Sequence, residues 1–185
     1  PPPPPGFPER LQPPGMVGSG VVVELEPETF AQRAMGPRVD VLLQLYSSSG
    51  CEACERFEKY YGKVAQRFPE LGYSDVAVAR YDIVRYALPV SIQSVSIAQL
   101  PAVIVLPARR KEPPWEYFRG TARPSELMYF LARHATNRIT LPPNPHLNRE
   151  EHAMWKEQVE QLPADRRDAE WRRVERETGL TKDEV

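Results

Sequence analysis

Short apolar runs alternate with amphipathic stretches from residue 21 to residue 134. Runs rich in Val, Ile and Leu are typical of strands, whereas apolar residues at intervals of three and four are typical of helices. Strands are predicted at residues 21–25, 39–46, 76–81, 102–106 and 115–119. Helices are predicted at residues 28–35, 54–68 and 125–134, with a helical or irregular stretch at 84–99. The predicted order is therefore βαβαβαββα, as in α/β domains.

The run at residues 39–46 is mostly apolar on both of its faces. Such a run is typical of a strand buried on both sides in a parallel sheet, so it is predicted as the central strand. The following helix carries its apolar side chains at helical spacing, and we expect all of them in the core. Pro69 is expected to end this helix, and Ser125 to be the N-cap of the last one. The apolar positions are Phe57, Tyr60, Tyr61, Val64 and Phe68.

Both flanks of this segment differ from it in composition. Residues 1–20 contain eight prolines and four glycines. A segment of this composition has too little apolar surface to fold alone. We interpret them as an extended arm, either a linker or a polyproline ligand. After a proline-rich break at 141–145, two charged helices are predicted, one beginning at Asn148 and one ending at Gly179. Three parts are predicted: an arm at 1–20, a domain at 21–137 and a helical extension at 138–185.

Charge and hydropathy exclude several classes of partner. The 185 residues carry a formal net charge of -1, and the sequence pI is about 6.4. Neither value gives an electrostatic reason to bind nucleic acid. No apolar stretch reaches the roughly 20 residues that would cross a bilayer. We expect protein partners, no nucleic acid and no transmembrane segment in this chain.

The two cysteines, Cys51 and Cys54, lie directly after the predicted central strand. The turn Ser47-Ser48-Ser49-Gly50 separates them from that strand, and a helix follows. A helix N-terminus favours a thiolate, so this spacing indicates a redox dithiol. A zinc site is the alternative, but it needs two further ligands, and the histidines are far along the chain at positions 134, 146 and 152. We predict no metal and no cofactor.

A second motif, Leu100-Pro101, enters the predicted strand at 102–106. With the CxxC motif and the element order, it resembles the thioredoxin-like superfamily, and most closely the domains of protein disulfide isomerases. The resemblance covers residues 21–137 and implies a central mixed sheet flanked by helices. It implies that Cys51 attacks a disulfide and Cys54 resolves the mixed disulfide. Leu100 and Pro101 would form the substrate groove, with a cis peptide bond beside Cys51.

The same resemblance indicates a degenerate site. The buried acid that takes the proton of the second cysteine is replaced by Gln44, whose amide cannot exchange a proton near neutral pH. The approach to Cys51 is one residue longer than in the family and lacks its tryptophan. Glu52 and Glu55 add carboxylates beside the thiols, which oppose a thiolate.

An isomerase-like CxxC motif in a degenerate site is compatible with two functions. One is a thioredoxin-like protein with a weak or non-catalytic dithiol, acting as a structural or docking subunit of a larger assembly. The alternative is a thiol–disulfide oxidoreductase of isomerase type. Trp155 and Trp171, single tryptophans on charged helices, are predicted as anchors for a partner or for the domain. A chain ending at Asn137 is expected to fold but to lose its partners.

Location stays open between the endoplasmic reticulum, another organelle and the cytoskeleton. The last residues, Lys182-Asp183-Glu184-Val185, resemble an endoplasmic reticulum retrieval signal with its final residue changed. Thr181 with Glu184 is equally a capping box, which would begin another helix of a chain that continues.

Overall fold

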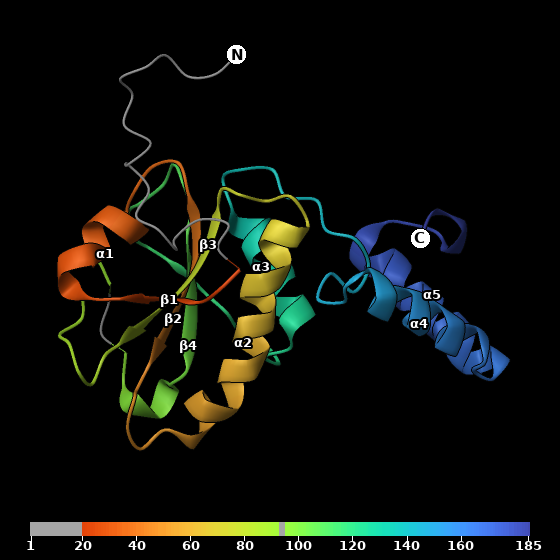
Figure 1. Ribbon diagram of the computed structural model, residues 1–185, viewed down its shortest axis with the longest axis horizontal. Coiled ribbons are helices and arrows are strands. Elements are labelled where there is room, and N and C mark those ends of the chain that lie inside the picture. Colours follow the sequence, from red (N-terminus) through yellow and green to blue (C-terminus); the bar gives the residue numbers. More distant parts are fainter. Residues whose placement is uncertain (1–19, 93–94) are drawn as a thin grey trace, which may run out of the picture.

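A mixed five-stranded sheet forms the centre of the computed structural model, which describes residues 20–92 and 95–185 (Figure 1). The predicted arm, except for Gly20, lies outside the described residues. The strand order is β1-β3-β2-β4-β5; β1, β3 and β2 run parallel, and β4 and β5 are antiparallel to their neighbours. The strands are β1 (Val23–Leu25), β2 (Asp40–Tyr46), β3 (Val76–Asp82), β4 (Ala102–Leu106) and β5 (Glu116–Tyr117).

Helices cover both faces of the sheet and bury β2 between them. Helix α1 (Pro27–Ala34) lies on one face, and α2 (Glu52–Glu70) and α3 (Pro124–His134) lie on the other (Figure 1). Leu43 and Leu45 join the buried cluster that contains Phe30 of α1, whereas Leu42 joins the cluster of α2 and α3. Because side chains alternate along a strand, Gln44 faces α2 together with Leu42. The prediction of β2 as a central, doubly covered strand is confirmed.

Three details of the predicted elements are wrong. Tyr60 is exposed on the solvent face of α2, whereas the other four apolar residues of its predicted set are buried. Helix α2 continues through Pro69 to Glu70, and its last turn is closed by Leu71 N–H, which donates to Arg67 O, and Gly72 N–H, which donates to Pro69 O, at 3.0 Å each. The N-cap of α3 is Arg123, not Ser125, because Pro124 occupies the first helical position.

The last predicted strand is shorter than the sequence indicates. Only Glu116–Tyr117 pair regularly with β4, although Phe118 N–H still donates to Val103 O at 2.8 Å. Pro113 and Pro114 precede the strand and have no N–H to donate, which prevents a longer ladder there. The side chain of Trp115 is buried, and its Nε1 donates to Ser91 O at 2.7 Å.

The C-terminal residues form a helical hairpin of α4 (Arg149–Glu160) and α5 (Ala164–Thr178), followed by η2 (Lys182–Glu184). Asn148 and Glu151 make the predicted capping box, and Gly179 ends α5 with a positive φ of 74°. The hairpin projects from the side of the domain that carries α2 and α3 (Figure 1). Lys63 of α2 pairs with Glu151 at 3.0 Å, and Arg67 Nε donates to Pro145 O at 2.9 Å.

Candidate dithiol site

Cys51 and Cys54 form a disulfide at the start of α2, with 5.2 Å between their Cα atoms. Cys51 is the N-cap of the helix, and its sulfur accepts the N–H of Cys54 at 3.1 Å. The side chain of Cys54 is only 5% exposed, whereas Cys51 is partly exposed. An external thiol therefore reaches Cys51 first, and a sulfur anion formed there would be stabilised by the helix N-terminus.

The turn before Cys51 is fixed by polar contacts with its own backbone and with β3. Ser47 Oγ donates to Ser49 O and accepts from Ser49 N–H, and Gly50 takes a positive φ of 66°. Asp82, at the end of β3, accepts hydrogen bonds from Ser48. Burial would raise the pKa of Asp82, but hydrogen bonds from Ser48 and from the backbone N–H groups of Arg85 and Val84 outweigh burial and lower it. Asp82 is thus an ionised anchor of the turn.

Gln44 lies beside the buried cysteine. It is 3% exposed and, with Cys54, lines a small cavity of about 210 Å³ between β2, β3 and the first turns of α2. Among the described residues its side-chain amide has no hydrogen-bond partner. Gln44 and Cys54 therefore lie at the same cavity, while the role of Gln44 as the replacement of an acid stays a prediction. The charged side chains at this cavity are those of Glu55, Glu58 and Arg80.

Arg80 holds two carboxylates near this cavity, those of Glu24 and Glu58. It pairs with Glu24 and, at 3.2 Å, with Glu58, and its guanidinium lies 4.8 Å from the centre of the Tyr46 ring. Tyr46 donates its hydroxyl to Glu24 at 2.5 Å, and burial together with Glu24 raises the pKa of Tyr46. Glu24 and Glu58 are therefore both bound to a cation instead of standing free to take a proton from Cys54.

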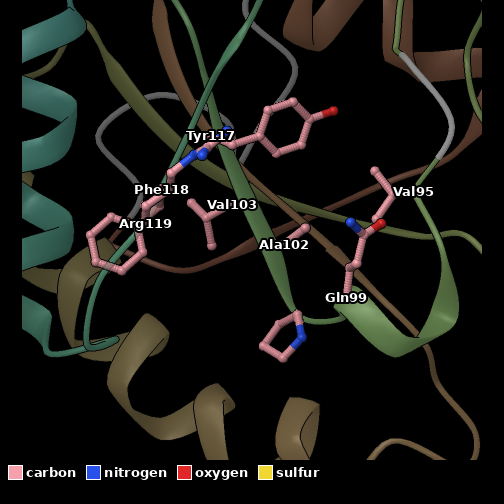
Figure 2. A pocket seen from close by; sticks show the side chains of 8 residues that line it. Val95, Gln99, Ala102, Val103, Tyr117, Phe118 and Arg119 are labelled. Atoms are coloured by element: carbon pink, nitrogen blue, oxygen red, sulfur yellow. The ribbon is translucent and has the colours of Figure 1, made fainter.

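Leu100 and Pro101 lie at the start of β4, and the peptide bond between them is cis. Pro101 lines a groove of about 520 Å³ together with Val95, Gln99 and Tyr117, and Figure 2 shows the Tyr117 ring and Gln99 on the same side of β4. Leu100 belongs to the buried cluster against which Cys51 packs. The structure thus brings the predicted groove residues and the dithiol to the same end of the sheet. The direct contact of Pro101 with Cys51 stays a prediction.

The two tryptophans lie apart from this site, in the hairpin. Their rings meet edge to face with 5.5 Å between the centres, and Trp155 Nε1 donates to Glu170 at 3.2 Å. Each indole is half-buried, so each covers the other and keeps part of its surface exposed. Their role as partner anchors stays a prediction.

Residues 20–92 and 95–185 contain neither a cluster of metal ligands nor a membrane-spanning helix. No group of three or more His, Cys, Asp or Glu side chains within this part could hold a metal ion. His134 meets Phe130 edge to face, with 4.9 Å between the ring centres. No helix in the same residues is long and apolar enough to cross a membrane.

Solved structures resemble this chain at low sequence identity. The first thioredoxin domain of mouse protein disulfide-isomerase A4 is 19% identical with a TM-score of 0.50, and the match covers 74% of this chain and 89% of that domain. The chain has the thioredoxin-like fold. The zinc-bound form of human ERp44 is 13% identical with a TM-score of 0.51, over 60% of this chain and 31% of ERp44. Full-length ERdj5 is 14% identical with a TM-score of 0.50, over 75% of this chain and 18% of ERdj5.

The predicted likeness to isomerase-type thioredoxin domains is thus confirmed for the fold. The thioredoxin-like chain spans less than a third of ERp44 and less than a fifth of ERdj5. No protein-family model matches it, and no curated protein matches its sequence.

Sequence reasoning missed Asp82 and Arg80 as parts of the site. Both lie on β3, and the register pairs Gln44 with Arg80 and Tyr46 with Asp82. The available signal was topological: parallel neighbours of a central strand end at the same edge of the sheet, so polar residues at the end of β3 meet the loop after β2.

Proposed function

We propose that this thioredoxin-like protein is a docking subunit of a protein assembly and that its dithiol exchanges disulfides slowly. The observation that carries the proposal is the position of Gln44, which is 3% exposed and lines one cavity with Cys54. Resolution of a mixed disulfide on Cys51 requires Cys54 to lose its proton before its sulfur attacks. A glutamine amide cannot accept that proton. Of the nearby carboxylates, Glu24 and Glu58 are held by Arg80, and Glu55 is exposed to water.

Docking is supported by the construction of the hairpin. Helices α4 and α5 carry few apolar residues, and only Val159 and Val174 among their described side chains are buried. Such helices gain little stability from their own contacts, so a projecting, charged hairpin is typical of an element that binds something else. Met154 and the open part of Trp155 provide apolar surface on α4.

The alternative, a thiol–disulfide oxidoreductase, is favoured by the position of Cys51. Its sulfur is partly exposed at a helix N-terminus, which suits attack on an incoming disulfide. The two functions differ in the rate at which Cys54 resolves the mixed disulfide.

Insulin reduction by the full chain tests the slow dithiol. We expect activity at least about tenfold below that of an active thioredoxin, because a positioned acid–base group contributes on the order of 10²–10⁴ to such steps. Gln44→Glu should raise the rate, and Gln44→Met, of similar volume but without an acid, should not. A wild-type rate equal to an active thioredoxin would establish the oxidoreductase, and no gain from Gln44→Glu would locate the defect in the turn at 47–50.

Docking is tested by purifying the tagged full chain from cells and measuring the size of the protein complex that co-purifies with it. The Cys51→Ser, Cys54→Ser double variant should recover the same assembly as the wild type. Loss of the assembly in the cysteine variant would place the binding surface at the dithiol and contradict the proposal.

A further inference from the structure

A second cleft, of about 570 Å³, lies where α5 meets α3 and the residues after β5. We name it the α3–α5 cleft. Its floor is apolar and extends the buried cluster between the sheet and α3, through Phe118, Tyr129, Ala132 and Ile139. Its volume is within the range of about 300–1,000 Å³ that is typical of binding sites.

Three arginines from three separate segments surround this floor. Arg119 follows β5, Arg133 is in the last turn of α3, and Arg176 is in the last turn of α5. All three are exposed, and within the described part of the chain none of their guanidinium groups has an ion pair or a hydrogen bond. Arg173, one turn before Arg176, is by contrast bound to both Glu170 and Glu177.

The carboxylates at the cleft do not neutralise these arginines. Glu177 lines the cleft but is paired with Arg173 at 2.6 Å. Glu126 is the other acidic side chain of the lining, and its carboxylate is unpaired among the described residues. Arg173 is shared with Glu170, so it balances only one of its two carboxylates, and the lining carries three arginines against two glutamates. The rim of the apolar cleft therefore keeps an excess of positive charge, carried by guanidinium groups that are free to bind a ligand.

We propose that the α3–α5 cleft binds an acidic, apolar peptide segment of a partner protein. An apolar side chain of the segment would cover Phe118 and Ile139, and flanking carboxylates would accept hydrogen bonds from the arginines, whose planar donors match a carboxylate. Arginine and aromatic side chains at an apolar centre are typical of interface hot spots. The inference rests on the proposed docking function and names its surface and partner chemistry.

A nucleic acid fits the cleft less well. Its phosphates need a continuous basic track, whereas these arginines surround one apolar floor. The chain has a formal net charge of -1, so it offers a long polyanion no wider basic surface beyond the cleft.

Binding is tested with the full-length protein and a fluorescein-labelled peptide, Glu-Glu-Leu-Phe-Glu-Leu-Glu, followed by fluorescence anisotropy. We expect saturable binding that weakens with added salt. Joint substitution of Arg119→Glu, Arg133→Glu and Arg176→Glu should weaken it at least about tenfold, because charged hydrogen bonds are lost and repulsion is gained. The matched variant Arg38→Glu, Arg149→Glu, Arg166→Glu has the same charge change at exposed arginines outside the cleft and should bind like the wild type.

Two further peptides separate the contributions of charge and apolar contact. Replacing every Glu by Gln, or the Leu and Phe residues by Ser, should each weaken binding. Equal binding of the Gln peptide would contradict the role of the arginines. Equal binding of the Ser peptide, together with displacement by an oligonucleotide, would make the cleft a general anion site and overturn the proposal.

The same variants in cells separate this inference from the docking function. If the wild type recovers no assembly, the docking function fails, and the peptide titration still decides whether the cleft binds acidic segments. If the wild type recovers an assembly that the cleft variant retains, the cleft inference fails alone.

Discussion

At the scale of single residues, buried polar groups show where this fold departs from a uniform apolar core. Gln44, Asp40, Asp82 and Arg67 are all buried, and each lies where two or more elements meet. Asp40 accepts hydrogen bonds from Ala108 N–H, Thr136 N–H and the Asn137 side chain. Gln44 differs from these three because the described chain gives its side-chain amide no partner.

Lys111 provides a pH-dependent test at this scale. Its Nζ donates to Val39 O and Leu106 O at 2.8 Å each; burial lowers its pKa to about 8, and Asp40 opposes that shift. The folded protein therefore loses this proton near pH 8, whereas the unfolded chain keeps it to about pH 10.5. Because the unfolded state binds more protons between these values, the free energy of unfolding rises with pH in this window.

We expect a gain on the order of 1 kcal/mol between pH 7.5 and 9.5, allowing for the part of the ammonium group that water reaches. Urea unfolding at the two pH values measures it. Lys111→Met, which has no proton to lose, should lack the gain. An equal gain in Lys111→Met would assign the pH dependence to other groups.

At the scale of elements, the hairpin is joined to α2 by contacts of unequal strength. Arg67 is buried and donates to Pro145 O, whereas the Lys63–Glu151 pair is about one-third exposed on both sides. Arg67→Met keeps the aliphatic stem and leaves the Pro145 carbonyl without its donor. We expect it to cost about 1–3 kcal/mol, and Lys63→Met less than about 1 kcal/mol.

Amide hydrogen exchange of α4, compared with that of β2, measures this difference. Exchange in α4 should be faster in Arg67→Met and nearly unchanged in Lys63→Met. Equal acceleration in both variants would mean that the surface pair, not the buried arginine, holds the hairpin.

Elements with a strong local pattern could be predicted from the sequence. The core strands β2 and β4, the helical hairpin and the Asn148 capping box all follow from apolar periodicity and local capping residues. The limits of β5 could not be predicted, because they depend on which N–H groups find a partner on β4. The same holds for the dithiol site: Cys51, Cys54 and Gln44 are visible in the chain, whereas the Arg80 cluster exists only once β3 lies beside β2.

At the scale of the whole molecule, the domain and the extension share a packed segment. Leu141 is 7% exposed and belongs to the same buried cluster as Phe68 and Leu127, and Pro143 and Pro145 are also buried. Residues 141–145 therefore contribute to the core of the thioredoxin-like domain, although they follow the predicted boundary at residue 137.

A chain ending at Leu147 is therefore expected to be more stable than one ending at Asn137. Loss of Leu141 alone removes about 2 kcal/mol of apolar burial. Thermal unfolding of the two truncated chains measures the difference. Equal melting temperatures would show that the domain closes without residues 141–145.

The indole pair of the hairpin has an optical consequence. The chain has three tryptophans: Trp115 lies in the domain, and Trp155 and Trp171 meet edge to face in the hairpin. Two indoles in such contact couple their electronic transitions and give a paired circular dichroism signal, to which the distant Trp115 adds nothing. A ligand that separates α4 from α5 would erase this signal and leave the emission of Trp115 unchanged, so the protein contains an intrinsic spectroscopic reporter of its hairpin.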